Sequence, residues 1–311
     1  MRIAFAGTPD FAAIQLAGLY EVGFVPIAVY TQPDRPQGRG QHCVPSPVKQ
    51  LALQHSTPVF QPKNFKKSET VEEMRALKLD ILVVAAYGLL LPQRVLDIPR
   101  YGCINVHASL LPRWRGASPI QQSVLAGDQT TGISIMQMTA GMDEGPILYQ
   151  VSYSIGQNDT SQTVHDALAT LGCQALCEVL SHFADYQAKA VSQPIHNVTY
   201  APKIQKHNAK IDWSQPAVAI ERAIRAFQPW PVIYSTLGDT VVRIFKAIVL
   251  PETAKSLPGT ILDTESGIIY VATQQGILGI TRAQLPGKSV MSSQALLNGH
   301  GHLFIKGSQF K

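Results

Sequence analysis

A strand, a helix and a second strand follow one another at the start of the chain, and this order constrains the fold strongly. Residues 2–6 and 25–30 are short apolar runs of strand length, and residues 11–22 between them have helical length and apolar spacing. Such a unit predicts parallel strands joined by a right-handed crossover. Residues 80–86 form a continuous apolar run, which is typical of a central strand covered on both faces. The sequence therefore predicts an α/β fold with a mostly parallel sheet.

The pattern of predicted secondary structure changes toward the C-terminal end of the chain. A length of 311 residues favours two domains, and a proline-containing segment at 189–206 is a candidate linker. About five short alternating runs with Gly and Pro turns follow residue 232, as expected of a small OB-like β-barrel. We predict a first domain at 1–188, a linker at 189–206 and a second domain at 207–311.

Positive charge is concentrated in the last third of the sequence. Residues 1–200 hold 14 Lys and Arg against 15 Asp and Glu, whereas residues 201–311 hold 12 against 6. This excess favours a polyanionic partner, with nucleic acid the first candidate. A basic domain that is merely well solvated is the competing interpretation.

Several classes of function are disfavoured by what the sequence lacks. Neither a G-x-G-x-x-G pattern nor a Walker A loop follows the first strand, which disfavours a dinucleotide or ATP site. No apolar run approaches the roughly 20 residues of a membrane helix. The four cysteines are scattered without a C-x-x-C pair, so we expect reduced thiols and no metal. We expect a cytoplasmic protein that makes no membrane contact.

The segment 101–116 is the strongest candidate for a functional site. Asn105 and His107 are two apart on an expected strand, so an amide and a titratable imidazole face the same space. Pro112 ends the ladder soon afterwards, and sites in α/β sheets lie where strands end. Taken singly, each residue is more often structural than catalytic.

Two loops add candidate binding residues. Residues 87–92 are an apolar loop after the central strand, which suits the wall of a pocket for a flat aromatic ligand; plain core packing is equally compatible. Residues 31–47 are too long for an ordinary connection and carry Arg35, Arg39 and His42 among glycines and prolines. They are either a flexible basic arm for phosphates or a solvated loop.

The central segment resembles the folate-dependent formyltransferase family. The resemblance rests on Asn105-x-His107-x-Ser109-Leu110-Leu111-Pro112-x-x-Arg115-Gly116, followed by Gly141-Met142-Asp143. Further segments resemble the tRNA-acting members of that family over essentially the whole chain. They include Thr31-Gln-Pro-Asp-Arg35-Pro, Pro45-Ser-Pro-Val-Lys49, Tyr200-Ala-Pro-Lys-Ile204, Pro229-Trp230-Pro231 and Gln284-Leu-Pro-Gly287-Lys288.

The resemblance implies a Rossmann-like formyltransferase domain followed by an OB-like domain. It implies transfer of the formyl group from 10-formyltetrahydrofolate to the amino group of methionyl initiator tRNA, by a monomer without a metal. The implied catalytic residues are Asn105, His107 and Asp143. The implied folate-binding residues are Ser109, Leu110, Leu111, Pro112, Tyr87, Gly88 and Leu89, and the implied tRNA-binding residues are Arg35, Arg39, His42, Lys49, Lys203, Lys206 and Lys288.

The sequence departs from the family pattern at a few positions. Gln41 and His42 stand where the family has a basic pair, and Glu144 stands where it has a small hydroxyl residue. Three other functions remain open at this stage: formyl transfer to a small amine such as an amino sugar nucleotide, release of formate by water, and RNA binding on a scaffold without catalysis.

Overall fold

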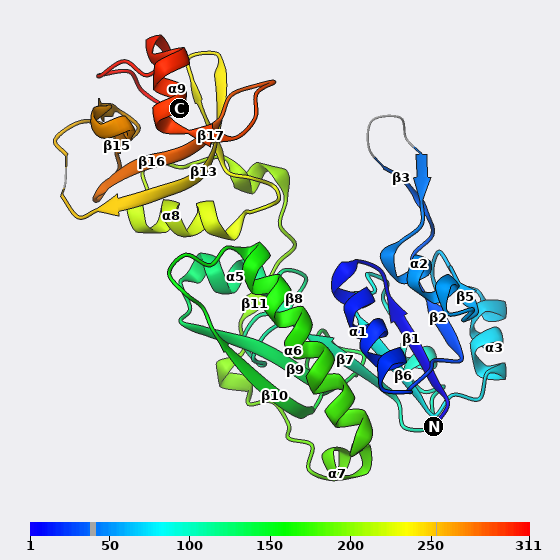
Figure 1. Ribbon diagram of the computed structural model, residues 1–311. Coiled ribbons are helices and arrows are strands. Elements are labelled where there is room, and N and C mark those ends of the chain that lie inside the picture. Colours follow the sequence, from blue (N-terminus) through cyan, green and yellow to red (C-terminus); the bar gives the residue numbers. More distant parts are fainter. Residues whose placement is uncertain (38–41, 253) are drawn as a thin grey trace. The chain divides into compact units, whose positions relative to one another are not determined.

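The computed structural model describes residues 1–37, 42–252 and 254–311, and the described chain forms two compact units (Figure 1). The first, here the N-terminal unit, comprises residues 1–119, 130–154 and 165–201. The second, the C-terminal unit, comprises residues 120–129, 155–164 and 202–311. Each unit is described by itself.

A seven-stranded sheet forms the centre of the N-terminal unit, in the order β10-β9-β7-β6-β1-β2-β5. The pairs from β7 to β5 are parallel, and β9 and β10 are antiparallel additions at one edge. All five residues of β1 and of β6 are buried, which confirms the predicted central strands. The strands are β1 (Ile3–Gly7), β2 (Ala28–Tyr30), β5 (Val59–Phe60), β6 (Ile81–Ala85), β7 (Cys103–His107), β9 (Thr130–Gln137) and β10 (Ile147–Ser154).

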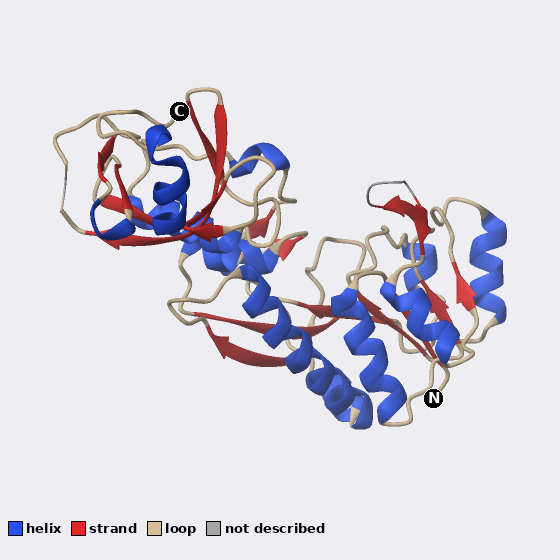
Figure 2. Ribbon diagram, turned by 45° about the horizontal axis from the view of Figure 1, so that its top comes forward, coloured by secondary structure: helices blue, strands red, loops and turns tan. Residues whose placement is uncertain are grey.

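Helices pack along this sheet (Figure 2). Helices α1 and α6 lie side by side, and Gln15 Nε2 of α1 donates a hydrogen bond to the carbonyl oxygen of Ala169 in α6 at 2.8 Å. A proline in the first turn starts α2, and the Ser46 hydroxyl caps it by accepting from the Lys49 amide. The helices are α1 (Asp10–Glu21), α2 (Pro47–Gln54), α3 (Ser68–Ala76), α4 (Gln93–Leu96), α6 (Ser161–Ser181) and α7 (Phe183–Ala188), with a 3-10 turn η1 (Ile195–Asn197).

The expectation of a plain loop at 31–47 is wrong in part. The segment contains a two-stranded antiparallel sheet of β3 (Arg35–Gln37) and β4 (His42–Val44). Each strand has only three residues, with a proline inside β3 and glycines at 38 and 40, so no alternation is visible in the sequence.

The segment 189–201 is integrated into the N-terminal unit. Strand β11 (Tyr200–Ala201) pairs in parallel with β8 (Arg115–Gly116), and the amide of Ile147 donates to the carbonyl oxygen of Val191. Part of the linker predicted at 189–206 is therefore fixed against the segment that follows β7.

The C-terminal unit is a small antiparallel β domain with the order β12-β13-β16-β15-β14, and β17 pairs with β16. This agrees with the predicted OB-like domain. Its buried core includes Trp213, Ile224, Ile244 and Phe310. The elements are α8 (Ala217–Ala226), β12 (Tyr234–Leu237), β13 (Thr240–Leu250), β14 (Ile261–Asp263), β15 (Ile269–Ala272), β16 (Ile277–Gln284), β17 (Met291–Ser292) and α9 (Ser293–His300), with 3-10 turns η2 (Lys206–Ala209), η3 (Glu265–Gly267) and η4 (Gly301–Leu303); α5 (Pro119–Ala126) contributes most of its length to this unit.

Among the described residues, no helix is both long enough and apolar enough to cross a membrane.

Candidate active site

The candidate site lies at the carboxyl ends of β6 and β7. Strand β1 has β2 on one side and β6 on the other, so the strand order reverses between β1 and β6. Ligands of open α/β sheets bind at the carboxyl ends of the strands beside such a reversal. Asn105 of β7 is paired with Val84 of β6, and the chain leaves β6 toward Tyr87. Reactive side chains and the predicted apolar loop are thus brought to one edge.

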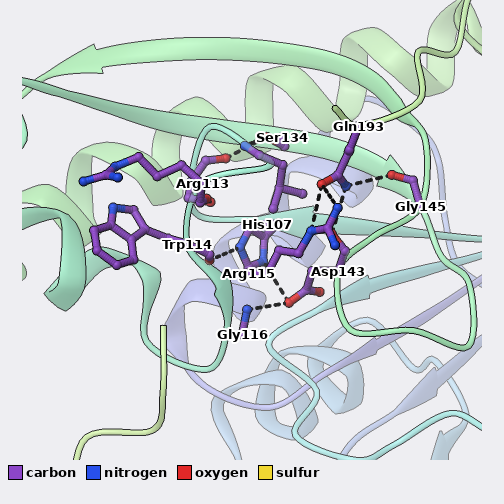
Figure 3. A network of polar contacts seen from close by, with 11 residues as sticks. His107, Arg113, Trp114, Arg115, Gly116, Ser134, Asp143, Gly145 and Gln193 are labelled. Carbon is purple, nitrogen blue, oxygen red and sulfur yellow. Dashed lines mark hydrogen bonds and ion pairs between the residues drawn. The ribbon is translucent and has the colours of Figure 1, made fainter. Parts of the chain in front are cut away.

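His107 ends β7 and is held by the segment that follows it. Its side chain is only 6% exposed, and its Nε2 lies 2.9 Å from the carbonyl oxygen of Trp114 (Figure 3). A carbonyl oxygen only accepts, so Nε2 carries a hydrogen and donates it. In the neutral ring Nδ1 then has a free lone pair, and this atom faces the Oδ2 of Asp143 at 3.8 Å. Nδ1 is therefore the nitrogen that can take up a proton.

Asp143 is fixed by its backbone and by its carboxylate. It lies between β9 and β10 with φ +50°, a left-handed conformation that Asp tolerates better than most residues. Its Oδ2 accepts a hydrogen bond from the Gly116 amide at 2.8 Å. This bond holds the carboxylate beside His107, where its negative charge stabilises a positive charge on the ring.

Gln193 joins the Asp143 turn to Arg115. Its Nε2 donates to the carbonyl oxygens of Asp143 and Gly145, at 2.8 Å each. Its Oε1 accepts from Nε and Nη2 of Arg115, at 3.0 and 2.8 Å. Both side chains are buried, so the amide satisfies groups that water does not reach.

The side chain of Asn105 remains available. It is half-buried, and within the described parts of the chain it forms neither a hydrogen bond nor an ion pair. An unpartnered amide beside an imidazole and a carboxylate provides a hydrogen-bond donor for a developing negative charge and a base for a proton. This combination fits acyl transfer.

The residues after β7 predicted to bind folate form a tightly bonded turn. The Ser109 hydroxyl donates to the carbonyl oxygen of Arg113 at 2.6 Å, and the Ser134 hydroxyl donates to the carbonyl oxygen of Ser109 at 2.7 Å. Leu111 and Pro112 line a cavity of about 470 Å³ with residues of β10, and Leu110 is half-buried. The assignment of these residues to folate stays a prediction.

The loop after β6 presents its backbone more than its aromatic ring. Tyr87 is 2% exposed, and burial raises the pKa of its hydroxyl above the usual range. Its carbonyl oxygen accepts from Thr8 Oγ1 at 3.0 Å and from Gln32 Nε2 at 3.1 Å. Gly88 is exposed and Leu89 half-buried. A pterin contact here remains a prediction, to which Tyr87 contributes by supporting the loop.

The basic residues predicted to bind tRNA are differently occupied in the N-terminal unit. Arg35 is exposed, and its Nη2 donates to Gln32 Oε1 at 2.7 Å. Lys49 forms an ion pair with Asp34 at 2.6 Å, so its charge is partly compensated. Arg39 and the side chain of His42 lie outside the described residues.

In the C-terminal unit, Lys203, Lys206 and Lys288 are exposed. Lys203 lines a cavity of about 470 Å³ that also includes His207 and Lys210. A role in RNA binding stays a prediction for all three predicted lysines.

Two parts of the site have no local signal in the sequence. Gln193 is 50 residues from Asp143 in a segment predicted as linker, and no local pattern marks it. Ser134 lies on a buried strand, and its hydroxyl also accepts from the Leu111 amide at 3.0 Å. Among the described residues, no group of three or more His, Cys, Asp or Glu side chains is placed to hold a metal ion.

Comparisons with known proteins identify the family of the chain. Residues 1–180 match the family described as formyl transferase, and residues 203–301 match the formyl transferase C-terminal domain. The chain is 52% identical over 300 residues to the methionyl-tRNA formyltransferase of Nitrosococcus oceani, covering 96% of this chain and 93% of that protein. It is 49% identical over 299 residues to the methionyl-tRNA formyltransferase of Hahella chejuensis, covering 96% and 94%.

A solved structure shares the fold at low sequence identity. An N-formyltransferase from Helicobacter canadensis, in complex with folinic acid and dTDP-3-aminofucose, matches with a TM-score of 0.68 and 18% identity. The match covers 92% of this chain and 99% of that protein.

Proposed function

The chain belongs to the formyl transferase family, and from that premise we propose that it transfers the formyl group of 10-formyltetrahydrofolate to the amino group of methionyl initiator tRNA. The observation that carries this proposal is the arrangement of an unpartnered Asn105 amide, the Nδ1 of His107 and the Asp143 carboxylate at the strand ends. The near-complete coverage by methionyl-tRNA formyltransferases at 49–52% identity supports the same substrates.

Asn105 would act on the developing charge. During acyl transfer the oxygen of the formyl group gains negative charge, and a donor already in place lowers the barrier. The free amide of Asn105 has no described partner to give up before it binds that oxygen. The strand register fixes the residue between Val84 and Met136, so little reorganisation is needed.

His107 and Asp143 would manage the proton. The amine must lose a proton as it forms the new bond, and Nδ1 of His107 is the free nitrogen that can take it. The Gly116 amide holds the Asp143 carboxylate 3.8 Å from Nδ1 of His107, where it then stabilises the charged ring. Because the carbonyl oxygen of Trp114 already binds Nε2, the ring cannot turn Nε2 toward the substrate without losing that hydrogen bond.

The remaining roles are proposed on the same basis. The folate would lie against the loops 87–89 and 109–112, and the tRNA would contact Arg35, Arg39, His42, Lys49, Lys203, Lys206 and Lys288. We propose domains at 1–188 and 207–311 that are joined by residues 189–206, of which 189–201 pack on the N-terminal unit. We further propose a monomeric state and a cytoplasmic location, where its folate and tRNA substrates occur.

A formyl-transfer assay tests the function. The wild-type protein is incubated with 10-formyltetrahydrofolate and one acceptor: methionyl initiator tRNA, methionyl elongator tRNA, free methionine or an amino sugar nucleotide. We expect transfer to the initiator tRNA and at most slow transfer to the others. Transfer to the sugar nucleotide instead would refute the assignment of the acceptor and keep the chemistry.

A further inference from the structure

A cavity of about 350 Å³ in the C-terminal unit is lined by charged residues that the sequence analysis did not single out. It lies between α8 and the paired strands β13 and β16. Three cations, Arg225, Lys246 and Arg282, line it together with one carboxylate, Glu221. The lining therefore carries a net positive charge of two.

Lys246 and Arg282 are placed opposite each other across the two strands. They are register partners, and the register shifts on both sides of Lys246. Both are exposed, and within the described residues neither forms an ion pair. Like charges directly opposite on neighbouring strands are destabilising, so their pairing needs a reason other than stability of the free protein. Irregularities of this kind re-aim side chains and are common at functional sites.

Arg225 provides a third cation in a fixed orientation. Its Nε donates to Glu221 Oε1 at 2.7 Å, and its Nη1 donates to the carbonyl oxygen of Asp159 at 2.9 Å. Glu221 is thereby neutralised locally, and the guanidinium is held before any ligand arrives. Such preorganisation reduces the entropy lost on binding.

Two side-chain amides line the cavity, Asn158 and Gln228, and that of Gln228 is already satisfied. Gln228 Nε2 donates to the carbonyl oxygens of Ile224 and Phe245, at 2.8 and 2.7 Å. The polar groups left to bind a ligand are the side chains of Asn158 and Thr160 and the three cations. The cations match phosphate oxygens in charge and geometry. The C-terminal third of the chain carries 12 basic against 6 acidic residues, and this surplus attracts a polyanion more than a single small anion.

We propose that Arg225, Lys246 and Arg282 form a phosphate-binding site that holds one phosphodiester of the bound tRNA. This site rests on the proposed function for the identity of the RNA, and it adds residues to the predicted tRNA-binding set. Lys246 and Arg282 bind the phosphate oxygens from the strands, and Arg225 binds from α8. The phosphate then screens the repulsion between Lys246 and Arg282.

The test is the salt dependence of binding by the full-length protein. Dissociation constants for methionyl initiator tRNA are measured over a range of salt concentrations for wild type, Lys246→Gln and Arg282→Gln. We expect each variant to bind about 5- to 10-fold more weakly and to lower the slope of log K against log salt by about one. Lys255→Gln removes the same charge from an exposed position outside the cavity and should change affinity less than about twofold.

Two further measurements separate the explanations. Turnover at saturating tRNA should match wild type in both variants, and their thermal midpoints should equal or exceed that of wild type because a like-charge contact is removed. Wild-type affinity and slope in both variants would overturn the site. The site would be assigned to a small phosphate instead if inorganic phosphate raised the thermal midpoint of wild type but not of the variants. In that case the slope of log K against log salt for tRNA would be the same in all three proteins. Failure of the proposed function is distinct, since the wild-type protein would then formylate no tRNA.

Discussion

Replacing Gln193 by Ala tests whether the amide that joins Asp143 to Arg115 supports catalysis. The substitution removes two bonds to backbone carbonyls and the acceptor for two guanidinium donors of a buried arginine. A neutral hydrogen bond contributes about 1 kcal/mol and a bond to a charged group about 1.5–3 kcal/mol. Because both guanidinium bonds share one oxygen, we expect a loss of about 4 kcal/mol in the free energy of unfolding.

The loss has two readouts. A unit of 150–250 residues loses about 2–4 °C in Tm per kcal/mol, so the N-terminal unit should melt about 8–16 °C lower, as followed by circular dichroism. The Asp143 turn also loses a tether, and displacement of a catalytic group by about 1 Å can cost 10²-fold in rate. We therefore expect kcat for formyl transfer, measured at a temperature below the new melting point, to be about 10²-fold lower than in wild type. The affinity for tRNA should be unchanged.

Gln193→Glu separates the interaction of residue 193 with Arg115 from its interaction with the Asp143 turn. The carboxylate still accepts from Arg115 but places an oxygen against the carbonyl oxygens of Asp143 and Gly145, where the amide nitrogen donated. We expect Tm to fall less than in Gln193→Ala, while kcat falls by a similar factor. A Gln193→Ala variant within 2 °C and twofold of wild type would refute the reasoning, and a fully active Gln193→Glu variant would limit the role of the amide to stability.

Three further predictions follow from single contacts. His107→Ala should lower kcat by about 10²–10⁴-fold in a steady-state assay while tRNA binding stays unchanged; an unaffected kcat would remove the residue from the mechanism. Gly88→Ala should lower Tm and raise KM for the folate, because Gly88 has φ +76° and an added Cβ would clash with Gln32 Nε2; wild-type values would show that the loop adapts. The hydrogen bond from Cys177, opposed in part by burial, lowers the pKa of Cys173 below its usual range, so alkylation of Cys173, followed by mass spectrometry, should rise with pH at a lower pH than for an ordinary thiol. In Cys177→Ala that rise should move to higher pH, and an unmoved profile would contradict this cause.

The parts of the fold with local signals were predictable. Strands β1 and β6 are visible because a strand buried on both faces is a continuous apolar run, and their burial is confirmed. Asn105 and His107 could be placed on one face because strand periodicity is two. Their roles came from the family resemblance, since composition and spacing alone left a structural interpretation open.

The remaining parts depend on contacts between distant segments. The hairpin of β3 and β4 has strands of three residues, too short to show alternation. The phosphate-binding site depends on a register shift between β13 and β16, which the sequence of neither strand reveals. The excess of positive charge in this region is visible in the sequence, but which cations share a cavity depends on the fold.

The orientation of the proposed catalytic pair, His107 and Asp143, depends on residues beyond the first predicted domain. Gly116, whose amide holds the Asp143 carboxylate, belongs to β8, and β8 is paired with β11. The amide of Trp114, whose carbonyl oxygen selects the tautomer of His107, donates to Thr199 Oγ1 at 2.9 Å. Segment 189–201 therefore provides three supports for the site: Gln193, Thr199 and β11. All three act through Trp114, Gly116 or the Asp143 turn and so position the proposed catalytic groups. Their loss should lower kcat without changing which acceptor is used.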